Sequence, residues 1–205
     1  MEFQDVVRRR RMVRNYDPDR PVPADVRDQI LRNALQAPSA GFSQGWAFLV
    51  LEDPADRERF WRRTTDSGGE RDAWLRGMQH APLLILCLSH KDAYLDRYAK
   101  ADKGWTDRDE SRWPVPYWDI DTGFAALLML LTAVDQELGT CFFGVPTSEI
   151  PAVREEFAIP EGYQPVGVVS VGYRAADRPS GSLKAGRRPL NDVVHMGHWG
   201  VRHAG

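Results

Sequence analysis

One long apolar run, at Phe124–Val134, strongly constrains what this chain can fold into. It reads FAALLMLLTAV. The run is far shorter than the roughly 20 residues that a membrane-spanning helix needs. A helix that is apolar around its whole circumference has no face suited to water. The run therefore predicts a helix that is covered on all sides, by the core of its own chain and by a second copy of the chain.

Four short apolar segments have the length and composition of strands, and helical segments lie between them. The expected strands are Trp46–Leu51, Leu83–Leu88, Thr140–Val145 and Val166–Tyr173. Leu83–Leu88 is continuously apolar, which is typical of a strand covered on both faces. Helices are expected at Glu2–Arg9, from Pro23 to the turn at Ala37–Gly41, and at Pro54–Arg63, Asp119–Leu138 and Ser148–Phe157. This interleaving indicates an α+β or α/β layer architecture.

Length and charge limit the classes of function. The chain has 205 residues and a formal net charge of −2, from 27 Lys and Arg against 29 Asp and Glu. We expect one domain over residues 1–205, with residues 99–118 as a lid insertion and residues 180–205 as a basic tail. A nucleic-acid binder would carry a strongly basic balance. Cys87 and Cys141 lie in apolar runs and form no C-x-x-C pair, which indicates a reducing, cytoplasmic compartment.

Several common signatures are absent from the sequence. No G-x-G-x-x-G follows a strand, and neither a G-x-x-x-x-G-K-[ST] loop nor a G-x-S-x-G elbow is present. His195 and His198 form an H-x-x-H pair without a third ligand, so no metal site is expected. No apolar stretch follows the basic residues Arg8–Arg11, so they are not a signal peptide. The sequence thus predicts neither a membrane nor a nucleic-acid partner.

Three segments have the composition of a ligand-binding site. Arg8–Arg14 carries guanidinium groups that can bind a phosphate bidentately, or form a solvated helix end. Ala37–Trp46 combines small residues with Ser39 and Gln44, which suits close approach to a flat ligand, although alone it indicates only a turn. Leu138–Pro146 is a strand end with a glycine on either side, equally typical of a core strand.

Taken together, in this order and spacing, the segments resemble the FMN-dependent nitroreductase family over nearly the whole chain. Five motifs of that family have counterparts here: R-R-S-x-R-x-[FY] at Arg10–Tyr16, P-V-P at Pro21–Pro23, A-P-S-x-x-N-x-Q-P-W at Ala37–Trp46, G-L-G-T-x-x-x-G at Leu138–Gly144, and R-x-P-L at Arg187–Leu190. The sequence departs from these motifs at three positions. Met12 stands where the family usually has serine, Phe42 where it has asparagine, and Gly45 where it has proline. The Q-G-W variant is similar to a subgroup of the family in high-GC bacteria.

The resemblance implies a fold, an assembly and a reaction. The fold is a three-layer α/β/α sandwich around a mostly antiparallel sheet. The assembly is a homodimer with FMN at the subunit interface. The reaction is a ping-pong hydride transfer through flavin N5, from NAD(P)H to a small aromatic, nitro or quinone-type acceptor. The cofactor supplies this chemistry, so no side chain is expected to be catalytic.

The resemblance also implies the cofactor-binding residues. They are Arg10, Arg11, Met12, Arg14, Pro38, Ser39, Ala40, Gly41, Phe42, Gln44, Phe143, Gly144, Arg187 and Arg188. In the family the first arginine segment and the R-x-P-L segment bind the FMN phosphate. The Ala37–Trp46 segment lies against the isoalloxazine of the neighbouring subunit, and a backbone N–H of Leu138–Gly144 faces N5. Arg14 is the expected cation beside the reduced flavin.

Four residues are candidates for the substrate pocket: Phe42, Trp113, Tyr117 and Trp118. Ordinary packing is the alternative for each of them. Other functions remain open from the sequence. Phe42 is also similar to the apolar residue of flavin-fragmenting dimethylbenzimidazole synthases, which share the fold. A flavin-dependent dehydrogenase, an FMN-storage protein and, last, a nucleic-acid binder using Arg8–Arg14 are the further alternatives.

Overall fold

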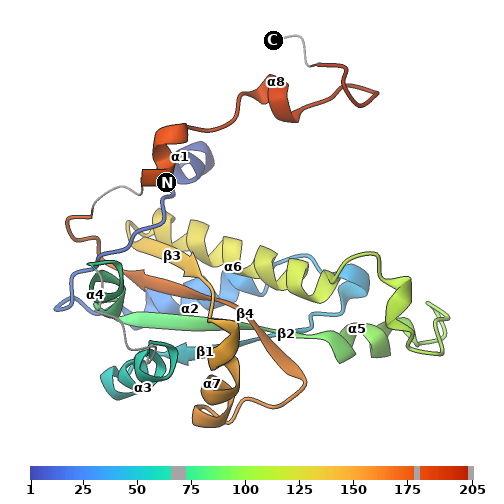
Figure 1. Cartoon of the computed structure of the whole chain (residues 1–205), viewed down its shortest axis with the longest axis horizontal. Coiled ribbons are helices and arrows are strands. Elements are labelled where there is room, and N and C mark those ends of the chain that lie inside the picture. Colours follow the sequence, from blue (N-terminus) through green and yellow to red (C-terminus); the bar gives the residue numbers. More distant parts are fainter. Residues whose placement is uncertain (66–72, 178–180, 203–205) are drawn as a thin grey trace.

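Four antiparallel strands form the centre of the protein in a computed structural model that describes residues 1–65, 73–177 and 181–202. The strands are β1 (Trp46–Leu51), β2 (Leu83–His90), β3 (Gly139–Phe143) and β4 (Tyr163–Gly172). Their spatial order is β1-β2-β4-β3, with every neighbouring pair antiparallel (Figure 1). All four predicted strands are therefore confirmed, with ends shifted by at most a few residues.

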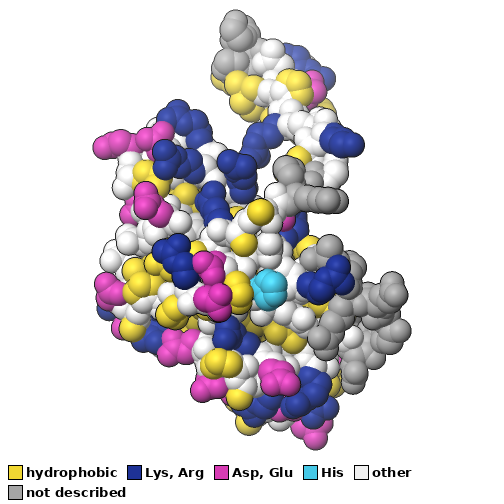
Figure 2. All heavy atoms as spheres, turned by 90° about the vertical axis from the view of Figure 1, so that its left-hand side faces the viewer, with side chains coloured by type: hydrophobic (Ala, Val, Ile, Leu, Met, Phe, Trp, Pro, Cys, Tyr) yellow, Lys and Arg dark blue, Asp and Glu magenta, His cyan; other side chains and the backbone are white. Residues whose placement is uncertain are grey.

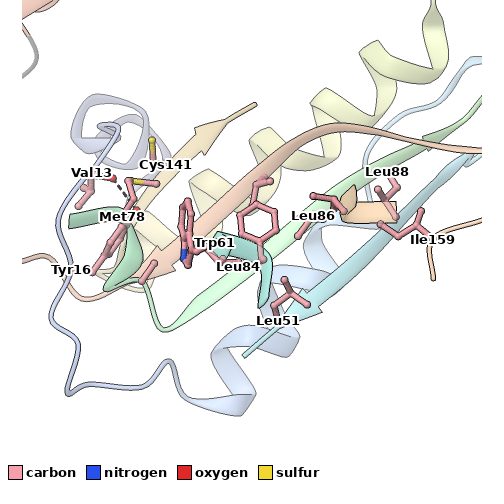
Figure 3. Packing of buried hydrophobic residues seen from close by; sticks show 14 residues of the cluster. Val13, Tyr16, Leu51, Trp61, Met78, Leu84, Leu86, Leu88, Cys141 and Ile159 are labelled. Atoms are coloured by element: carbon pink, nitrogen blue, oxygen red, sulfur yellow. Dashed lines mark hydrogen bonds between the residues drawn. The ribbon is translucent and has the colours of Figure 1, made fainter. Parts of the chain in front are cut away.

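Helices cover both faces of this sheet because β2 is apolar at successive positions, and side chains alternate between the faces of a strand. Leu84, Leu86 and Leu88 belong to one core cluster, which also contains residues of α3 (Pro54–Thr64), α4 (Ala73–Gln79) and α7 (Ile150–Glu156) (Figure 3). Leu83, Ile85 and Cys87 belong to the second cluster, with α2 (Ala24–Ala34) and α6 (Tyr117–Asp135). The predicted three-layer α/β/α arrangement is thus confirmed.

The other described helices are short. They are α1 (Phe3–Arg9), η1 (Ala40–Phe42), α5 (Lys91–Tyr98), η2 (Glu110–Arg112), η3 (Thr147–Glu149), η4 (Gly181–Ala185) and α8 (Leu190–Val193). The helix expected at Ser148–Phe157 is divided between η3 and α7. Helices α4 and α5 were not predicted, because seven and eight residues are too few for a helical period to show in the sequence.

Helix α6 is buried on one side only within this chain. Ala125, Met129 and Ala133 are fully buried against the sheet and α2. Ile120, Phe124 and Leu127 are 37%, 44% and 45% exposed. Among the described helices α6 alone is long and apolar enough to cross a membrane, with a mean hydropathy of 1.3 over a window that is 56% buried in the fold. The second copy of the chain that the sequence predicts would have to cover this exposed side of α6.

The C-terminal segment extends away from the sheet (Figure 1). Its large apolar side chains are uncovered in the single chain. They include Leu190, Met196 and Trp199, and Trp199 is 90% exposed. The described part of this segment begins at Gly181, so the predicted boundary at residue 180 lies outside the described residues.

Candidate functional site

The arginine segment is divided in two: Arg8 and Arg9 form the exposed last turn of α1, as in the helix-end alternative, and the part from Met12 onward is bound to the edge of the sheet. The backbone N–H of Val13 donates to the Thr140 carbonyl of β3 at 2.8 Å. Tyr16 is fully buried, and its hydroxyl donates to the Val13 carbonyl at 2.9 Å (Figure 3). The same hydroxyl lies 2.8 Å from Ser170 Oγ, in β4. Burial raises the pKa of Tyr16, so the phenol stays protonated and able to donate.

Beside this segment lies a cationic cavity of about 340 Å³. Its lining residues are Arg10, Arg11, Met12, Val13, Arg14, Arg174, Ala175, Asp177, Leu183 and Arg187. Five guanidinium groups therefore face one carboxylate. Lys and Arg side chains gather between the body of the molecule and the projecting tail in Figure 2. We call this cavity the arginine pocket.

The charges of the arginine pocket are not balanced within the described part of the chain. Arg10 Nη1 is buried and has no hydrogen-bond partner there. Burial, and then the nearby charge of Arg11, lower the pKa of Arg174. The Asp177 carboxylate accepts the backbone N–H of Arg14 at 2.8 Å. A buried donor without an acceptor is costly, so the pocket favours an anionic ligand such as a phosphate.

Of the two C-terminal arginines predicted to bind the cofactor, the structure brings only Arg187 to the pocket. The Arg188 guanidinium instead donates to the Asp192 carbonyl at 2.9 Å, within the tail. Met12, which replaces the usual serine, lines the pocket, and its sulfur accepts the Phe142 N–H at 3.4 Å. The thioether therefore binds the β3 backbone rather than offering a hydroxyl to a ligand.

Residues 37–46, which we call the 37–46 loop, lie away from the arginine pocket. None of the described residues that line the pocket comes from this loop. Ser39 Oγ accepts the Gln44 N–H at 3.0 Å, and Ala40 N–H donates to Asp121 Oδ2 at 2.8 Å. Pro38, Phe42 and Gln44 are exposed, with Phe42 at 75%. The loop thus presents its predicted ligand-binding face to the outside of the chain.

The β3 end sends Phe143 into the core. Its ring stacks on Trp61 at 5.6 Å between centroids and meets the edge of Trp74 at 6.2 Å. The ring of Phe143 is therefore occupied in the core, and only its backbone could make the predicted contact with a cofactor. Gly144 follows the strand and is exposed.

The aromatic residues near 99–118 pack against α5, which the sequence did not reveal. Trp113 lies 4.6 Å from Tyr98, 5.5 Å from Trp105 and 6.0 Å from Trp118 between ring centroids. Trp118 is only 9% exposed. This geometry corresponds to the packing alternative for Trp113 and Trp118. Of the three pocket candidates in this segment, Tyr117, at 37% exposed, is the most accessible.

Sequence reasoning missed three polar residues of this region. Arg174 lies just beyond β4 and lines the arginine pocket. Asp121 and Arg97 bind the backbone of the 37–46 loop. The only signal for Asp121 is a carboxylate near the start of an apolar helix. Within the described residues, no group of three or more His, Cys, Asp or Glu could hold a metal ion.

Comparisons with known sequences show which proteins this chain resembles. The model of the nitroreductase family matches residues 7–173. A Methanothermobacter thermautotrophicus protein, provisionally named an NADH dehydrogenase/NAD(P)H nitroreductase, is 27% identical over 204 residues, covering 97% of this chain and 88% of that protein. An Archaeoglobus fulgidus protein with the same provisional name is 30% identical over 192 residues, covering 93% and 94%.

Comparisons with solved structures address the fold. A Bacillus subtilis structure, provisionally named a nitroreductase, has a TM-score of 0.75 and 19% identity, covering 95% of this chain and 98% of that one. An Exiguobacterium sibiricum structure of a provisionally named nitroreductase, in complex with FMN, has a TM-score of 0.73 and 21% identity, covering 96% and 97%. At these identities the likeness shows the fold, and it confirms the predicted nitroreductase-like α+β class.

Proposed function

Because this chain belongs to the nitroreductase family, we propose that it is an FMN-dependent oxidoreductase that reduces an aromatic, nitro or quinone-type acceptor with NAD(P)H. The arginine pocket is the observation that carries the proposal. An FMN phosphate would supply the acceptor that the buried Arg10 Nη1 lacks, and would offset the surplus of guanidinium charge. When bound, FMN supplies the hydride-transfer chemistry.

The chain's own residues hold and orient the cofactor. Arg10 and Arg187 come from opposite ends of the chain and would bind the phosphate oxygens. Arg14 lines the same pocket and stays close to β3, because its N–H is bound by Asp177 and its Nη1 donates to the Met12 carbonyl at 3.1 Å. A cation fixed in this way stabilises negative charge on a ligand without having to reorganise.

The second half of the site comes, in this proposal, from a second copy of the chain. The 37–46 loop faces outward, and Ile120, Phe124 and Leu127 expose apolar surface along the free side of α6. Burying that stripe against its symmetry mate would complete the core around α6 and bring each loop to a neighbouring cofactor. We therefore propose a homodimer with FMN at the subunit interface.

The acceptor class follows from Phe42. A side chain that is 75% exposed does not pack beneath its own loop, which was the alternative to a role in the pocket. Its ring offers an apolar edge where the family's asparagine would offer an amide. A flat hydrophobic acceptor, such as a quinone or an aromatic compound, suits this surface better than a small polar one.

The visible spectrum of the purified protein tests the proposal. We expect a yellow protein with about one FMN per chain, which NADH or NADPH bleaches without oxygen and a quinone or nitroaromatic acceptor restores. A colourless protein that fails to bind added FMN at micromolar levels contradicts the proposal. Bleaching by another substrate without NAD(P)H would indicate a dehydrogenase, a benzimidazole product would indicate flavin fragmentation, and bound FMN without turnover would indicate storage.

A further inference from the structure

The 37–46 loop adopts a backbone conformation that its own sequence does not favour. Gly41, Phe42 and Gln44 have φ angles of 61°, 55° and 49°. Phenylalanine and glutamine rarely occupy this left-handed region. Such residues persist where the surrounding structure holds them in place, and they gather at ligand-binding sites. Bonds within the loop, such as Gln44 N–H to Ser39 Oγ, hold part of this shape, and two contacts from outside the loop add to them.

The first such contact is a buried carboxylate. Asp121 in α6 is 3% exposed, and its Oδ2 accepts both the Ala40 N–H at 2.8 Å and the Tyr94 hydroxyl at 2.9 Å. Tyr94 is fully buried. Burial, and then Asp121, raise the pKa of Tyr94, so its hydroxyl keeps its proton and donates. The neutral phenol and the loop amide together satisfy the carboxylate.

Tyr94 in turn requires the glycine that replaces the family's proline. A Cβ at position 45 would lie 2.5 Å from Tyr94 Cε2 and 2.7 Å from the His90 carbonyl oxygen. Proline carries such a Cβ, so it does not fit beside this tyrosine. The departure at Gly45 is thus matched to Tyr94 and to the carboxylate that Tyr94 binds.

The second contact comes from α5. Arg97 Nε donates to the Gly41 carbonyl at 2.8 Å. The other two nitrogens of the guanidinium bind both carboxylate oxygens of Asp102, at 2.9 and 2.7 Å. This bidentate pair fixes the planar guanidinium in the orientation in which Nε faces the loop. Asp102 belongs to the long segment that precedes α6, so that segment supports the loop indirectly.

We propose that Asp121 and Arg97 are positioning residues that hold the 37–46 loop in the conformation that binds the FMN of a neighbouring subunit. The inference rests on the proposed function. A loop held in its binding conformation loses little entropy when the ligand arrives. Releasing either contact therefore weakens FMN binding, while the sheet and its two core clusters, which contain neither Asp121 nor Arg97, keep the fold.

The test uses Asp121→Asn and Arg97→Gln in the full chain. Each variant has a matched control: Asp119 lies on α6 like Asp121, and Arg108 pairs with α5, the helix of Arg97. Asp119→Asn removes a carboxylate that binds Ser89 Oγ at 2.6 Å, and Arg108→Gln removes a guanidinium that pairs with Asp92 and Asp96. Neither control residue has a described contact with the loop. The measurements are FMN affinity by fluorescence quenching, the midpoint potential of bound FMN, melting without FMN, and amide exchange of residues 37–46.

We expect each test variant to weaken FMN binding by about tenfold or more, as the loss of one charge-assisted hydrogen bond implies. Loop exchange should accelerate, the potential should shift, and the melting temperature without FMN should fall no further than that of the matched control. The controls should match the wild type in FMN affinity, potential and loop exchange, and their melting temperatures measure the cost of losing a comparable contact elsewhere. Wild-type FMN affinity and loop exchange in both test variants would overturn the inference. If the wild-type protein binds no FMN, the proposed function fails, and loop exchange still decides whether Asp121 and Arg97 hold the loop.

Discussion

The Val13 N–H lies 2.8 Å from the Thr140 carbonyl oxygen, and this one hydrogen bond joins two motifs that are far apart in the sequence. It aligns the arginine segment with β3. The guanidinium groups of Arg10 and Arg14 consequently lie beside the end of a strand that is fixed in the sheet. A charged segment that would repel itself in solution is thereby held ready for an anion.

Arg187 and Arg188 are adjacent in the sequence, but only Arg187 lines the arginine pocket, so Arg188 serves as the control for Arg187. Arg187→Ala should weaken FMN binding by about one to two orders of magnitude, from the loss of a charge-assisted contact of about 1.5–3 kcal/mol. Arg188→Ala should have little effect. Titration of FMN and of riboflavin, which lacks the phosphate, measures the difference. Equal losses for the two ligands would mean that Arg187 acts on folding.

Phe42→Asn should not lower the melting temperature. The phenylalanine ring is 75% exposed, and asparagine tolerates a φ of 55° better than phenylalanine does. If the ring contributes to the acceptor pocket, the variant keeps its FMN and changes its ranking of quinones against nitroaromatics. Thermal melting and acceptor kinetics test the two statements. A clear loss of stability with an unchanged ranking would contradict both.

Gly45→Pro, which restores the residue usual in the family, should destabilise this protein by about 1–3 kcal/mol, because its Cβ overlaps Tyr94 and the His90 carbonyl. Gly181→Ala is the control. A Cβ there meets nothing within 4 Å, so stability should be nearly unchanged. Urea unfolding of the two variants measures these changes. A neutral Gly45→Pro would mean that the loop can shift away from Tyr94.

Leu127→Glu should separate the proposed dimer, because it places a charge within the exposed apolar stripe of α6. FMN affinity should fall with it, since the 37–46 loop would no longer meet a neighbouring subunit. Light scattering and FMN titration test this. Gln136→Glu, at the exposed end of the same helix, adds the same charge outside the stripe and should leave the assembly intact. A wild-type protein that is monomeric with FMN bound would contradict the proposed assembly.

Cys87 should make the protein less stable at alkaline pH. Burial raises the pKa of its thiol from 9.0 to about 12. The folded protein therefore keeps this proton at a pH where the unfolded chain has lost it. The stabilisation is fully present below pH 9 and is lost between pH 9 and about 12, at about 1.4 kcal/mol per pH unit. Urea unfolding of wild type and Cys87→Ala over this range should show a shallower decline in the variant, and equal slopes would contradict the assignment.

The sequence alone determined the layers of the fold and the principal cofactor segments. The continuous run at Leu83–Leu88 can be buried only between two layers, and this follows from residue type and from the period of two in a strand. The arginine segment and the Ala37–Trp46 segment were recognisable because their residue types occur at fixed local spacings. Such signals lie within a few consecutive residues and need no knowledge of distant neighbours.

The tertiary structure alone decided which of these side chains meet. The pairing of β3 with β4 brings Arg174, just beyond β4, to the same pocket as Arg10, and α5 and α6 bring Arg97 and Asp121 to the loop. It also turned Phe143 into the core and left Phe42 exposed. Whether a polar group is buried, paired or free depends on contacts between residues far apart in the chain. Desolvation and hydrogen bonding at those contacts arise only once the layers have packed.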